Sequence, residues 1–180
     1  MNDKELVIQQ TKKWVELVVI GCNFCPFAAK EVRHDKVHYE IDLSEREGTC
    51  LSSFANECKR LDENDQIETS LLIFPNAVPG FYEYLKLLES AEKYLMKNDY
   101  EGVYQVASFH PLYCFEGSNN DDPANYTNRS VYPMLHLLRE SSVELALKKY
   151  SNPDNIPERN IHFARQKGLV FMKTLRDACL

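Results

Sequence analysis

The chain has 180 residues, of which 44% are hydrophobic, and a formal net charge of −6. This is enough for one domain with a substantial core and short for two. The net negative charge argues against a nucleic-acid-binding protein, because affinity for phosphates comes from clustered Lys and Arg. No apolar run reaches the roughly 18 residues that span a membrane, and no basic segment followed by an apolar stretch marks an export signal. We therefore expect a cytoplasmic protein that binds neither nucleic acid nor membrane.

The N-terminal segment, about residues 1–34, is expected to be helical. Between residues 3 and 20, apolar side chains recur at helical intervals, which predicts a helix that faces the core. Gly21 is expected to end this helix in the left-handed conformation that glycine tolerates best. Pro26 is expected to begin a short second helix.

The central part of the chain, residues 37–109, is expected to alternate between strands and helices. The elements predicted from apolar periodicity are strands at 37–43, 70–74 and 103–109 and helices at 45–62 and 79–96. Helices of this length can connect parallel strands, and such crossovers are nearly always right-handed. The order predicts a βαβαβ unit with a small, mainly parallel sheet.

The C-terminal part, residues 133–180, is expected to form a helical cap. One helix is predicted at 133–149, with Pro133 at its start, and another at about 155–176. No interdomain linker or repeat interrupts the chain. The prediction is a single α/β domain over residues 1–180, with an N-terminal helix, a βαβαβ core and a C-terminal helical cap.

Residues 110–132 form the loop in which a functional site is expected. No helical or strand period persists between Phe109 and Pro133, and connections longer than about 12–15 residues are usually functional or disordered. The aromatic residues of this loop argue against disorder. If the three strands are parallel, the loop leaves the same sheet edge as Pro75–Asn76, where open parallel sheets bind ligands.

Three residues are candidates for catalysis. His110 follows the last predicted strand directly and could act as a base near neutral pH. The alternative is a strand-end histidine that only hydrogen-bonds the loop. Asp122, or its neighbour Asp121, could orient His110 or bind a cation, and equally could start a turn. Cys25 is an optional nucleophile.

Arg129 and Asn128 precede the helix predicted at 133, where free backbone N–H groups would favour an anion. Phosphate or carboxylate recognition is one interpretation, and an ion pair from Arg129 to Asp121 or Asp122 is the other. Other candidate binding residues are Tyr113, Tyr126 and Asn76. The leading hypothesis is a small enzyme that acts on a small anionic molecule, and the sequence predicts no particular cofactor or oligomeric state.

The competing hypothesis is a non-catalytic binding or interaction domain, in which loop aromatics grip the ligand or partner. In that case the ring nitrogens of His110 should both be occupied by hydrogen bonds within the protein.

A weaker alternative is thiol redox chemistry at Cys22 and Cys25, which are spaced as CxxC. Zinc is not expected, because no second Cys or His pair accompanies them. His38, Glu40 and Asp42 have a spacing that could hold a metal, although solvent-facing strand residues commonly show it.

The motifs IGCNFCPFA, LLIFP, ASFHPLYCFEG, DDPANYTNRSVYPMLHLLRE and PERNI resemble those of the bacterial family catalogued as domain of unknown function 1415. The resemblance covers essentially the full length and implies a bacterial cytoplasmic protein, with no established activity. The family pattern commonly reads GLNLCPFA, with leucine where Cys22 stands here. This departure weakens the dithiol hypothesis and leaves Cys25 as the thiol of interest.

Overall fold

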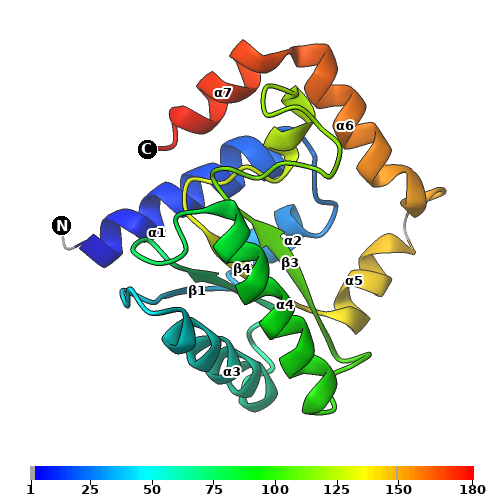
Figure 1. Cartoon of the computed structure of the whole chain (residues 1–180). Coiled ribbons are helices and arrows are strands. Elements are labelled where there is room, and N and C mark those ends of the chain that lie inside the picture. The colour runs from blue at the N-terminus through cyan, green and yellow to red at the C-terminus, as the bar shows by residue number, and fades with distance from the viewer. Residues whose placement is uncertain (1–2, 149) are drawn as a thin grey trace.

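The structure is a computed structural model that describes residues 3–148 and 150–180. A four-stranded sheet lies between two layers of helices (Figure 1). The strands are β1 (Val37–Ile41), β2 (Thr69–Ile73), β3 (Tyr104–Phe109) and β4 (Met134–Arg139). Their order is β1-β2-β4-β3, with β1 parallel to β2 and β4 antiparallel to both of its neighbours. The α/β class is confirmed, whereas the mainly parallel βαβαβ sheet is wrong.

β4 lies where the sequence predicted the first part of the helix at 133–149. The strand occupies the middle of the sheet and is largely buried on both faces. Its apolar residues therefore form a nearly continuous run, which periodicity alone does not distinguish from a buried helix. Helix begins only at α5 (Glu140–Leu147). The helix N-terminus expected after Arg129 is thus replaced by the start of a strand.

The carboxyl ends of β1, β2 and β3 nevertheless lie at one edge of the sheet. β3 and β2 are both antiparallel to β4, so they point the same way. Ile41 pairs with Ile73, and Met134 pairs with both Ile73 and Phe109, which forms one row across the sheet. The long loop after Phe109 therefore connects two neighbouring strands, β3 and β4, at this edge.

Alternating strand residues supply two separate cores. Leu71 and Ile73 face the first core and Leu72 the second. The first is covered by α1 (Asp3–Trp14), the π-helix η1 (Val15–Ile20), α2 (Ala28–Arg33), the 3₁₀-helix η2 (Pro123–Thr127), α6 (Ile156–Lys167) and α7 (Leu169–Asp177). The second is covered by α3 (Glu47–Glu63) and α4 (Phe81–Lys97). We call these the α1 face and the α3 face (Figure 1).

Two glycines shape the helices of the α1 face. Gly21 has φ −61°, so the predicted left-handed ending is wrong. A Cβ at Gly21 would instead collide with the carbonyl oxygen of Leu17, so close approach requires glycine here. The single helix predicted at 155–176 is divided at Gly168, whose φ of 82° suits glycine, into α6 and α7. A short 3₁₀-helix, η3 (Pro153–Asn155), precedes α6.

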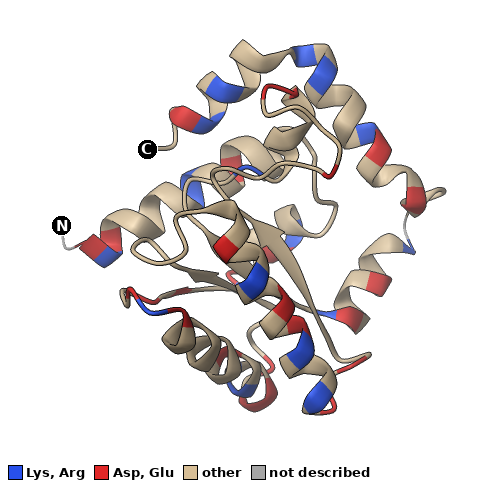
Figure 2. Ribbon diagram, viewed as in Figure 1, with Lys and Arg blue, Asp and Glu red and all other residues tan. Residues whose placement is uncertain are grey.

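Acidic and basic residues are interspersed along α4 (Figure 2), whereas α6 has one acidic and three basic residues. Among residues 3–148 and 150–180, no helix combines the length and the apolar character needed to cross a membrane.

Candidate functional site

His110 is fully buried just after β3. Its Nδ1 accepts a hydrogen bond from the backbone N–H of Leu112 at 3.0 Å, so the proton is on Nε2, which donates to the carbonyl of Val78 at 3.0 Å. Burial lowers the pKa of His110, although the bond to Val78 partly opposes this. The ring packs against Phe81 and Tyr84. Both ring nitrogens are thus occupied, and proton transfer to a ligand would require breaking one of these bonds.

Arg129 and Asn128 bind backbone carbonyl groups of the protein itself. Arg129 donates from Nε to Tyr113 at 2.8 Å and from a terminal nitrogen to Asn120 at 2.9 Å. Asn128 donates to the carbonyl of Ser108 at 3.2 Å. The guanidinium group therefore ties the two ends of the loop together, and it pairs with neither of the neighbouring aspartates.

Asp121 and Asp122 have different surroundings. Asp122 accepts the backbone N–H of Ala124 at 2.9 Å and so caps η2. Arg165 of α6 also binds both carboxylate oxygens of Asp122, at 3.1 and 2.7 Å, and this pairing lowers the pKa of Asp122 to about 2. The side chain of Asp121 is exposed. Asp122 thus caps η2 and, through Arg165, holds α6 against the loop.

The remaining predicted binding residues are also used within the fold. Tyr113 packs against Phe81 and Phe115. Tyr126 is only 4% exposed and belongs to the core of the α1 face. Asn76 donates to the carbonyl of Leu43 at 3.0 Å, which joins the ends of β2 and β1. The polar side chains of the predicted site are thus bound mainly to backbone groups and, for Asp122, to Arg165.

Cavities surround the segment Cys25–Phe27 on the α1 face. An inner cavity of about 50 Å³ lies beneath α1, η1 and α2, and an outer groove of about 290 Å³ lies between the sheet, α5 and the start of α6. The residues that line both are Cys25, Phe27, Phe109 and His136. A side cavity of about 390 Å³, next to α5, is also lined by Phe27. Cys25 thus lines both the inner cavity and the outer groove, and the other two catalytic candidates, His110 and Asp122, line neither.

His136 of β4 supplies a hydrogen-bond acceptor to this region. Thr69 donates its one hydroxyl proton to the carbonyl of Leu137 at 2.7 Å. The 2.6 Å contact between Thr69 Oγ1 and His136 Nε2 therefore has the histidine as donor. Nδ1 is left unprotonated, with no hydrogen bond to residues 3–148 or 150–180. Burial lowers the pKa of His136 to about 4, so the ring is neutral at neutral pH.

Glu31 of α2 is the charged residue of the inner cavity. It is 1% exposed, and neither carboxylate oxygen accepts a hydrogen bond from the described residues. Lys30 Nζ lies 3.0 Å from Oε1, but outside hydrogen-bonding geometry, and the lysine side chain is 59% exposed. Glu31 lines the side cavity as well as the inner one. It is therefore a buried carboxylate between two hollows.

The Cys25 thiol is not activated in this structure. Burial raises its pKa, and the backbone N–H groups of Phe27 and Ala28 only partly offset this effect. Burial also raises the pKa of Cys22, and both cysteines are free. Since the thiolate is the reactive form, both thiols are protonated and weakly nucleophilic at neutral pH.

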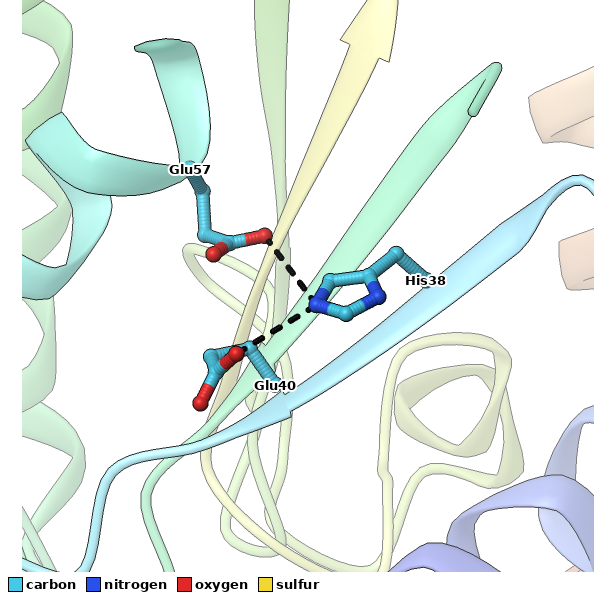
Figure 3. Close-up of side chains that lie close together, drawn as sticks. All are labelled: His38, Glu40 and Glu57. Atoms are coloured by element: carbon cyan, nitrogen blue, oxygen red, sulfur yellow. Dashed lines mark hydrogen bonds and ion pairs between the residues drawn. The ribbon is translucent and has the colours of Figure 1, made fainter. Parts of the chain in front are cut away.

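A separate polar cluster lies on the α3 face (Figure 3). His38 Nε2 lies 3.3 Å from Glu40 and 3.8 Å from the buried Glu57 of α3, and all three side chains point toward one another. Arg60 donates to Glu57 at 2.9 Å and to Glu40 at 3.1 Å, and Ser70 donates to Glu57 at 2.5 Å. The spacing would suit a metal ion, but Arg60 already pairs with both carboxylates. Asp42, the third residue of the sequence pattern, instead binds the hydroxyl of Ser53 and the backbone N–H of Ser44.

The sequence alone predicted no role for Glu31 or for His136. The signal for Glu31 was present, because it stands four residues after Phe27, at a core-facing position of a short helix. A carboxylate in such a position is unusual unless it is paired. His136 could be assigned only once Met134–Arg139 was known to be a strand.

Neither the comparison with curated proteins nor that with solved structures gives a match. Residues 6–174 match the family model described as "Protein of unknown function (DUF1415)". Because this match spans nearly the whole chain, the protein belongs to that family.

Proposed function

We propose that the protein binds a small organic molecule in the hollow around Cys25–Phe27. The observation that carries this proposal is the junction of the inner cavity and the outer groove at Cys25, Phe27, Phe109 and His136. Ligand sites are concave and mostly apolar, with a few polar groups that fix orientation. The two hollows have this character, and His136 Nδ1 offers an unoccupied acceptor.

Binding has more support than catalysis. A general base works best when its pKa is near the working pH, whereas the pKa of His136 is about 4. His136 is therefore suited to accept a hydrogen bond from a ligand. The enzyme hypothesis based on His110 has weaker support, because both nitrogens of that ring are already bonded. Redox chemistry has weaker support too, because both thiols of the CxxC motif have raised pKa values.

The six free cysteines support a reducing compartment such as the bacterial cytoplasm.

The single tryptophan provides a direct test. Trp14 is 1% exposed and lines the inner cavity, so a ligand there should change its fluorescence. We expect titration with benzyl alcohol, a neutral probe, to give a saturable change with a Kd on the order of millimolar, as suits a fragment of this size.

A blocking variant checks the position of the probe. Ala146 of α5 lines the outer groove and the side cavity, and every residue of α5 is at least partly exposed. Ala146→Phe should fill the groove and weaken probe binding by about tenfold or more, equivalent to about 1.4 kcal/mol. Ser141→Phe adds the same ring at an exposed position of α5 and should bind like the wild type. Equal binding by both variants, or no saturable change in the wild type, would exclude the proposed site.

A further inference from the structure

We infer that the ligand carries a cationic amino group, which Glu31 binds while the apolar part of the ligand lies in the outer groove. This inference rests on the proposed function and specifies the class of ligand. It changes the expected sign of the ligand charge, because the sequence predicted an anionic molecule bound near Arg129.

Glu31 is a buried carboxylate that lacks a hydrogen-bond donor in the described part of the chain. A buried charge without hydrogen bonds costs free energy, and folded proteins normally pair such groups. Glu31 is 1% exposed, and no described residue donates a hydrogen bond to either of its oxygens. Glu68, which lines the same side cavity, is in contrast bonded by Lys36 and Ser142. Glu31 is thus an acceptor without a donor, and an ammonium group would supply the missing donors.

The inner cavity is lined by apolar side chains and a few polar groups. Its described lining contains one carboxylate, Glu31, and neither Lys nor Arg. The other polar groups there are the thiol of Cys25, the hydroxyl of Thr69, the imidazole of His136 and the indole N–H of Trp14, which donates to the carbonyl of Arg129 at 3.2 Å. The hydroxyl proton of Thr69 is used within the sheet, and His136 Nδ1 is an acceptor. The cavity therefore offers acceptors to a ligand, which favours a hydrogen-bond donor and disfavours an anion.

Among the described residues, Lys30 is the cation that pairs with Glu31. Its Nζ lies 3.0 Å from Glu31 Oε1, and pairing with Glu31 raises the pKa of Lys30. The lysine side chain is 59% exposed. An ion pair with a largely exposed lysine contributes little, because solvent screens the lysine charge, and this pair leaves Oε2 of the buried Glu31 uncompensated. Lys30 lines the side cavity but not the inner one, so a ligand ammonium group can bind Glu31 from the inner cavity without displacing Lys30.

The test compares three probes of nearly equal shape: benzylamine, benzyl alcohol and benzoate. In the wild type, measured by Trp14 fluorescence, benzylamine should bind about tenfold more tightly than benzyl alcohol, and benzoate most weakly, since a hydrogen bond to a charged group exceeds a neutral one. Glu31→Gln keeps the shape and removes the charge. It should bind benzyl alcohol within about twofold of the wild type and lose the preference for the amine.

Glu144→Gln is the matched control, because it makes the same change of charge at an exposed position of α5 and should keep the preference. Binding of benzyl alcohol without a preference for benzylamine in the wild type would overturn the inference and leave the proposed site intact. Loss of the preference in Glu144→Gln, or its retention in Glu31→Gln, would also overturn it. If none of the probes bound, the proposed function would fail. The wild-type comparison remains decisive even if Glu31→Gln does not fold.

Discussion

The tautomer of His136 depends on one hydroxyl group. Because Thr69 gives its proton to the carbonyl of Leu137, His136 must donate from Nε2 and keep Nδ1 unprotonated. Protonation of Nδ1 would place a positive charge in a mostly apolar layer beneath α1 and α2. Burial accordingly keeps the pKa of this histidine at about 4, below the ordinary value of 6.5.

This shift predicts a loss of stability in mild acid. A histidine whose pKa is lower in the folded state stabilises the fold above pH 6.5, and this contribution is lost as the pH falls toward 4. Between pH 7 and pH 5, His136 should account for a decrease of about 2 kcal/mol in the free energy of unfolding. Urea denaturation at both pH values should show that decrease in the wild type and in His34→Gln, which changes an exposed histidine. His136→Gln should lack it, and an equal decrease in all three proteins would contradict the assignment.

At the scale of elements, the loop before β4 works as a clamp for the C-terminal helices. Arg129 holds the two ends of the loop, and η2 packs against both α6 and α7. Asp122 caps η2 and pairs with Arg165 of α6, so one side chain serves both elements. The unusual length of the loop is explained by this packing.

Removal of this side chain should therefore weaken the clamp. Asp122→Ala should lower the free energy of unfolding by about 1–2 kcal/mol, mainly through loss of the cap, since the ion pair with an exposed arginine adds little. Asp121→Ala removes an adjacent, exposed carboxylate and should cost less than about 0.5 kcal/mol. Urea denaturation of the two variants measures the difference. Equal losses would mean that the cap and the pair with Arg165 do not hold η2.

The elements with a clear period were predicted well from the sequence. β1, β2, β3, α3 and α4 lie within a few residues of their expected ranges. β4 was missed because most of its residues are apolar on both faces of the strand. The sequence of such a buried strand is a continuous apolar run, which cannot be distinguished from part of a buried helix. The candidate site depended on the same assignment: with a helix at 133–149, His136 has no defined partner, and with a strand it meets Thr69. Hydrogen bonds that satisfy His110 and Arg129 come from backbone groups, which residue types alone do not identify.

At the scale of the whole molecule, the two ends of the chain build one core. α1 and α7 both pack on the α1 face, where Trp14 and Met172 are almost completely buried. Because the sheet separates this core from that of the α3 face while its strands serve both, we expect the domain to unfold as one unit.

α7 offers a matched pair of substitutions that tests this expectation. Met172→Ala should lower the free energy of unfolding by about 2–5 kcal/mol, because Met172 is 0% exposed. Val170→Ala, on the same helix but 80% exposed, should cost less than about 0.5 kcal/mol. Trp14 fluorescence and far-UV circular dichroism should give coincident urea transitions in both variants. Separate transitions would show that the two cores unfold independently.

The position of β4 has a consequence for synthesis of the chain. β4 is the last strand to leave the ribosome, yet it joins β2 to β3. A nascent chain that ends before residue 134 has the helices of the α3 face and three strands, but two of these strands lack their common neighbour. The sheet can therefore form completely only after most of the polypeptide has emerged. Until then, the unpaired edges of β2 and β3 are available to other chains. Protection by chaperones is therefore most valuable at this stage of synthesis.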